Sequence, residues 1–202
     1  MGSHEYVLKL PADWHPLDGE TEGEHRAFAD LVANFEVDVA TASRLLIALD
    51  SVWSAASSSK RNGGRTWALV RDPQSGNVDA ILTSDIRVLT EGFGFDKYLD
   101  LVTESAKSTD SLEVVNRTFL TTQLPAGPAI VVHDFVLPLE MNGVQDPATE
   151  RVICAIFPLG WNVMAEFAVV TQNLVLSTDL AADVLPIFAT FEVLSETEAI
   201  RS

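Results

Sequence analysis

Four stretches with the composition of β-strands follow one another closely in the carboxyl-terminal half of the chain, and their spacing constrains the fold most. They are residues 112–123, 129–139, 151–157 and 161–176. Hairpin connections join antiparallel neighbours, whereas parallel strands need a crossover of about a dozen residues or more. Because the segments between the four stretches are mostly hairpin-sized, the sequence predicts a mainly antiparallel sheet.

Three further strands are expected in the amino-terminal half, at residues 5–10, 66–72 and 78–89. The last two flank a turn at 72–77, where Pro73 sets a negative φ and either Gly76 or Asn77 can accept a positive one. Within 78–89, apolar residues alternate with the polar residues Asp79, Thr83, Asp85 and Arg87. This period of two predicts a sheet with one face exposed to water.

Helical periodicity is found in four segments. Apolar residues recur at i, i+3, i+4 and i+7 from Phe28 to Phe35, and a second such pattern runs from Val39 to Ala56. A third helix is expected at 96–107, and a fourth begins near 177–179 and contains Pro186, which predicts a kink.

Together these elements predict an α+β fold: a mainly antiparallel sheet of six or seven strands, with two N-terminal helices, one middle helix and a C-terminal helix packed on it. No segment has the composition of a linker between domains, so residues 1–202 are expected to form a single domain, with 1–4 as a flexible start or an expression remnant.

Net charge limits the classes of partner. The chain has 29 Asp and Glu residues against 13 Lys and Arg residues, a net charge of −16. Phosphate backbones and anionic lipid surfaces repel such a chain, so nucleic acid and membrane partners are not expected. The start of the sequence lacks the basic and apolar regions of a secretory signal, which predicts a cytoplasmic location.

Groups able to carry out catalysis are scarce in the sequence. The single cysteine, Cys154, lies in an apolar run, where a thiol behaves as a small hydrophobic side chain. His133 alternates with Val131 and Phe135, which favours a hydrogen-bonded residue at the edge of the core over a general base. Acidic residues could meet across strands in two pairs, Asp79 with Asp85 and Asp134 with Glu166, as expected for a solvated face.

Metal and nucleotide sites are not expected either. The four histidines show no spacing typical of zinc ligands. The glycines of 92–95 lack the third glycine and the lysine of a phosphate-binding loop. No catalytic residue, cofactor or metal is therefore assigned.

Three aromatic residues are the candidate binding residues. Trp14 lies in a loop bounded by prolines, and Phe93 and Phe95 stand next to glycines, outside any strand or helix stripe. Exposed aromatic side chains of this kind are typical interface anchors. The alternative is that each side chain folds back and closes an open end of the core.

Two stretches of the chain have a familiar order. Residues 124–132 form a turn leading into a strand, and residues 156–188 carry a long strand followed by a closing helix. This succession resembles small actinobacterial proteins with the PsbP-like α/β sandwich fold. The resemblance covers about the last 110 residues. It implies an antiparallel sheet with helices packed on it, and members are mostly of unknown function or act as accessory or docking proteins.

The functional expectation is a non-enzymatic module that binds another protein, with a homodimer as one possible form. The alternative is a small-molecule or lipid-binding module with a cavity between sheet and helices. A protein binder needs an exposed apolar patch, a carrier needs a cavity, and an enzyme needs convergent polar groups in one pocket.

Overall fold

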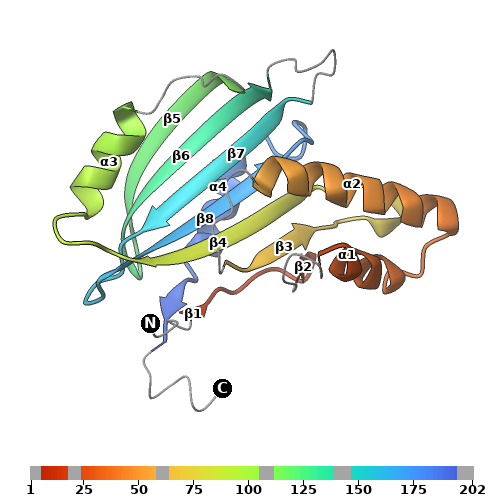
Figure 1. Cartoon of the computed structure of the whole chain (residues 1–202), viewed down its shortest axis with the longest axis horizontal. Helices are drawn as coiled ribbons and strands as arrows, with labels where there is room; N and C mark the ends of the chain where they lie inside the picture. Colours follow the sequence, from red (N-terminus) through yellow and green to blue (C-terminus); the bar gives the residue numbers. More distant parts are fainter. Residues whose placement is uncertain (1–5, 18–23, 58–63, 105–111, 139–146, 195–202) are drawn as a thin grey trace.

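The computed structural model describes residues 6–17, 24–57, 64–104, 112–138 and 147–194. The main element is a seven-stranded sheet with the order β2-β3-β4-β8-β7-β6-β5 (Figure 1). Every neighbouring pair is antiparallel. The strands are β2 (Trp14–Pro16), β3 (Thr66–Leu69), β4 (Ala80–Val88), β5 (Leu112–Leu124), β6 (Gly127–Pro138), β7 (Thr149–Ile156) and β8 (Val163–Thr171).

A second, two-stranded sheet joins the two ends of the described chain. β1 (Tyr6–Val7) pairs with β9 (Glu192–Val193), with Tyr6 opposite Val193. The Tyr6 ring lies 5.9 Å from that of Phe191, and its hydroxyl is 2.5 Å from Ser84 Oγ of the main sheet. The small sheet is thereby attached to the main core.

Four α-helices and one 3-10 helix complete the fold: α1 (Glu24–Ala33), α2 (Val39–Ser57), η1 (Pro73–Ser75), α3 (Phe95–Glu104) and α4 (Leu180–Phe188). Two aspartates fix helix starts. The Asp38 carboxylate accepts hydrogen bonds from the backbone of Ala40 and Thr41, and Asp179 accepts from Ala182. These bonds to the charged form lower the pKa of Asp38, and they satisfy backbone donors that a helix start leaves free.

The helices cover both faces of the sheet. α4 lies behind the sheet in the view of Figure 1, and α2 and α3 lie in front of it, toward opposite ends. Strand alternation agrees, because Met164 and Val170 of β8 share one face, Met164 packing in the α3 cluster and Val170 in the α2 cluster. The helices α2 and α3 thus divide one face between them.

The main core lies between the sheet and α4. Phe167 of β8 is fully buried and stacks on Phe188 at 5.5 Å, while Phe191 meets it edge-on at 5.2 Å. Aromatic pairs at these separations stabilise a core beyond the effect of their buried area. This cluster confirms the expected α+β fold with a mainly antiparallel sheet.

Several local expectations need correction. The predicted strand 5–10 is only β1, and residues 14–16, predicted as loop, pair with β3. The polar face expected for β4 is not open to water, because Ile81 and Thr83 on that face are buried. α2 packs against β4 there, and a half-polar strand cannot reveal from its own sequence which neighbour covers it.

Among the described residues, no helix combines the length and apolar character needed to cross a membrane. The predicted end of α3 at 105–107 and the start of the chain at 1–4 lie outside those residues.

Candidate interaction surface

The strand β5 forms one edge of the main sheet. It has 13 residues and pairs along its length with β6, from Leu112 opposite Pro138 to Leu124 opposite Gly127. The sheet order ends at β5, so within the described chain no strand lies on its other side (Figure 1). Edge strands carry backbone N–H and C=O groups that another strand can bind.

Apolar side chains are exposed on both faces of β5. Phe119, opposite Val132, is 39% exposed on the face that carries α3, and Leu120 is 50% exposed on the face of α4. Val115 is 57% exposed. Exposed apolar residues along a long edge strand are unusual in a protein that has no partner there.

A β-bulge interrupts the pairing of β5 between Val114 and Asn116, and Val115 is the extra residue. Bulges bend an edge strand and limit its pairing. The bulge therefore separates the first residues of β5 from the regular stretch that follows, residues 116–124. Within that stretch Arg117 is the only charged residue.

A buried carboxylate ties β5 to the sheet. Asp134 of β6 is fully buried and accepts hydrogen bonds from Arg117 Nε at 2.5 Å and Arg117 Nη2 at 2.8 Å. Arg151 Nη2 of β7 donates to the same carboxylate at 2.6 Å. The three residues lie side by side in one row across β5, β6 and β7. Two guanidinium groups thus share one buried carboxylate.

A second charged group attaches α3 to the sheet. Arg87 donates to Asp85 at 2.6 Å and to Glu166 at 2.9 Å, and the Tyr98 hydroxyl donates to Glu166 at 2.9 Å. Burial, followed by the charge of Glu166, raises the pKa of Tyr98 well above its usual range. The expected pair of Asp134 with Glu166 does not form, since each carboxylate binds arginine instead.

His133 occupies the face predicted for it and has a partner that the sequence did not reveal. Its Nε2 lies 2.7 Å from Glu150 Oε1, and the Glu150 side chain is 4% exposed. Glu150 stands one strand away on β7, near the start of that strand. His133 is therefore a hydrogen-bonded histidine at the edge of the core.

The cysteine of the chain does not serve as a nucleophile for the pair of His133 and Glu150. Cys154 is fully buried, and burial raises the pKa of its thiol to about 12. A thiol that stays protonated at neutral pH is a poor nucleophile. Across the described segments, no three His, Cys, Asp or Glu side chains gather into a possible metal site.

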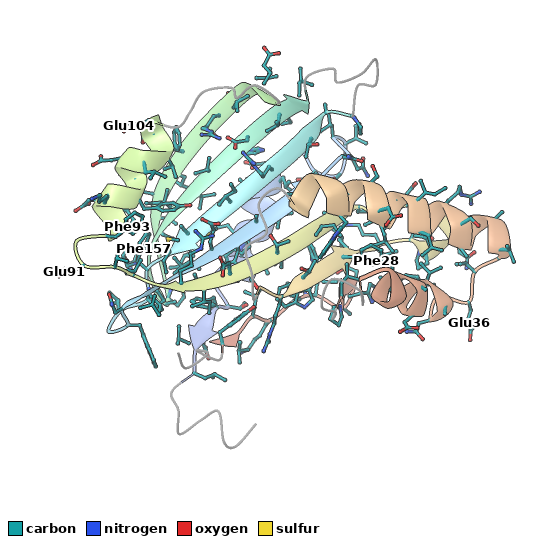
Figure 2. All side chains as sticks on the ribbon, in the orientation of Figure 1. Phe28, Glu36, Glu91, Phe93, Glu104 and Phe157 are labelled. Atoms are coloured by element: carbon teal, nitrogen blue, oxygen red, sulfur yellow. The ribbon has the colours of Figure 1, made fainter. Side chains whose placement is uncertain are left out.

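The three candidate aromatic residues do not form one site. Trp14 is 8% exposed and packs in the main core. Phe93 and Phe95 are half-buried against the α3 cluster, where the Phe95 ring meets Phe157 edge-on at 5.6 Å. Figure 2 labels Phe93 beside Phe157 at that end of the sheet. All three side chains cover core, as the alternative interpretation describes.

Comparisons with known proteins do not assign the chain to a family. No protein-family model and no curated protein matches the chain. A crystal structure of a Bacteroides thetaiotaomicron protein is similar over 95% of this chain and 46% of that chain, with 8% identity and a TM-score of 0.47. This chain therefore spans under half the length of that protein. Such a likeness supports no conclusion about function.

Proposed function

We propose that this chain is a non-enzymatic protein-binding module that uses the free edge of β5 to receive an extended segment of a partner. In binding of this kind, backbone hydrogen bonds supply affinity and alternate side chains supply specificity. The observation that carries the proposal is the 13-residue edge strand with Val115, Phe119 and Leu120 exposed.

The charge pattern supports a neutral strand as the ligand. Residues 118–125 carry no charged side chain, although the whole chain has a net charge of −16. An approaching partner thus meets little charge along this stretch, while the rest of the surface repels acidic proteins and nucleic acid. The proposal includes a cytoplasmic location and a role like that of PsbP-like accessory proteins.

Position-specific photo-crosslinking tests the proposal. A photoreactive residue replaces Leu120 in cells of the native host, and the matched control carries it at Leu159, which is 68% exposed in the β7–β8 connection. We expect a crosslinked product from position 120 and none from position 159. Adding Phe119→Lys to the position 120 variant should remove the product, because a charge opposes strand addition.

The mass of the product identifies the partner as another protein or a second copy of this chain. Equal crosslinking at both positions, or none at position 120, would contradict the proposal.

A further inference from the structure

A shallow groove of about 550 Å³ opens between α2 and the end of β8, beside η1. Its apolar part is formed by side chains of α2, among them Ile47, Ala48 and Val52. Ile47 is 70% exposed at this place, which is high for an isoleucine on a helix that covers a sheet. The groove is remote in the chain from β5, which does not line it.

The groove carries a positive charge, whereas the whole chain has a net charge of −16. Arg44 is the only charged residue that lines it, and no carboxylate does, although the chain has 29 acidic residues. Arg44 Nη2 donates to Thr41 Oγ1 at 2.9 Å. It forms no ion pair within the described part of the chain. Its charge acts on the nearby Asp38 carboxylate, which accepts hydrogen bonds from Ala40 and Thr41 and does not line the groove. A guanidinium with no direct bond to a carboxylate has donors available for an anion.

Arg44 lies against Gly76. Gly76 has φ +74, and a Cβ at this position would lie 2.7 Å from Arg44 Nε. The side chain of Arg44 therefore rests against the backbone at the end of η1, where only glycine gives it room. The Arg44 side chain therefore passes close to the backbone of Gly76, and both residues line the groove.

Two side-chain amides add further donors. Gln172 Oε1 accepts a hydrogen bond from Ser51 Oγ at 2.9 Å, which leaves the Gln172 amide nitrogen free to donate. The side-chain amide of Asn77 has no hydrogen-bond partner among the described residues. Donors from Arg44, Gln172 and Asn77 thus line one groove next to an apolar surface.

We propose that this groove binds a small organic anion: a carboxylate contacts Arg44 and the two amides, and its hydrocarbon part lies on Ile47 and Val52. The proposal develops the small-molecule alternative expected from the sequence. It does not depend on the role of β5, because the two surfaces share no residue.

Backbone amide NMR with three six-carbon probes tests this inference. Hexanoate, hexanol and hexylammonium carry the same chain with a negative, neutral or positive end. We expect hexanoate to cause saturable shifts at the amides of Ser51, Gly76 and Asn77, and hexylammonium to cause none there. Hexanol should bind at least tenfold more weakly than hexanoate, since it lacks the charge that Arg44 binds.

Substitutions separate the groove from general effects of charge. Arg44→Gln should weaken hexanoate binding by about tenfold or more, and Arg44→Lys should retain part of it. Arg71→Gln is the matched control, because Arg71 is also exposed but does not line the groove. Unchanged thermal unfolding verifies that each variant folds. Hexanoate shifts outside the groove, equal binding of hexylammonium, or an Arg44→Gln variant that binds like the wild type would each overturn the inference.

Discussion

The two edges of the main sheet differ in length, composition and exposure. At one edge, β2 has three residues, ends at Pro16 and buries Trp14 in the core. At the other, β5 has 13 residues and exposes Phe119 and Leu120. Short strands and proline protect an edge from pairing, whereas a long edge with apolar side chains invites it. Within the described residues, the contrast shows one edge protected by a short strand with proline and one long edge without a further strand.

Truncating one aromatic residue at each edge gives the largest test of this contrast. Trp14→Ala should lower the free energy of unfolding by about 4 kcal/mol, because it leaves a cavity in the main core. Phe119→Ala should lower it by about 1 kcal/mol or less, since Phe119 is 39% exposed. Urea denaturation of both variants measures the difference, and equal losses would show that β5 is packed as tightly as β2.

The buried carboxylate that holds β5 provides the second test. Asp134→Ala should cost about 3 kcal/mol, because Arg117 and Arg151 then lose their shared partner in a nearly dry place. The value falls at the lower end for a buried pair since both arginines keep some contact with water. Asp100→Ala on the exposed side of α3 is the control and should change stability by less than about 0.5 kcal/mol.

A pH experiment tests whether the centre of the sheet is closed to water, in contrast to the exposed edge at β5. The pKa of Cys154 is raised to about 12 in the folded state, against about 8.5 in unfolded chains. The unfolded state therefore loses this proton first, so the contribution is complete below pH 8 and declines as the pH rises toward 12.

Between pH 8 and pH 10 the wild type should lose about 2 kcal/mol more than Cys154→Ala, from 1.36 kcal/mol per pKa unit. Comparing the change with pH within each protein cancels the constant effect of the altered packing. Urea denaturation at both pH values measures this change. Identical changes in the two proteins would mean that the thiol is open to water.

The smallest expected effect concerns Leu120. Leu120→Lys should change the free energy of unfolding by less than about 0.5 kcal/mol, because a half-exposed edge position tolerates a long charged side chain. The same variant should remain soluble at higher concentration than the wild type if the edge promotes association, as light scattering would report. A stability loss above about 1 kcal/mol would place Leu120 in the core.

The sequence predicts the positions of the helices and strands better than it predicts which elements lie next to one another. Periodicity located α1 and α2, and strand-like composition with hairpin-sized spacing located β5 to β8, because these patterns depend on local structure. The sequence did not show that β5 forms an edge, since its side chains do not alternate clearly and no local pattern reveals a missing partner. It also missed β2, because a strand of three residues containing proline lacks a detectable period.

The candidate sites were harder to predict for the same reason. Trp14, Phe93 and Phe95 stand out in the sequence as loop aromatics, but whether such a residue is exposed depends on what lies beside it in the fold. The partner of His133, Glu150, lies across a hairpin. Arg44 could not be recognised as a candidate binding residue from the sequence, because the residues that line the groove with it, Gly76, Asn77 and Gln172, come from other parts of the chain.

The pairing of β1 with β9 sets an order of events during synthesis. Tyr6 leaves the ribosome early, yet the residue opposite it, Val193, is made only after the seven strands of the main sheet. Closing so long a loop carries a large entropic cost until the intervening chain has folded. β1 therefore pairs only after β9 has been made, and this pairing joins the first and last strands of the described chain.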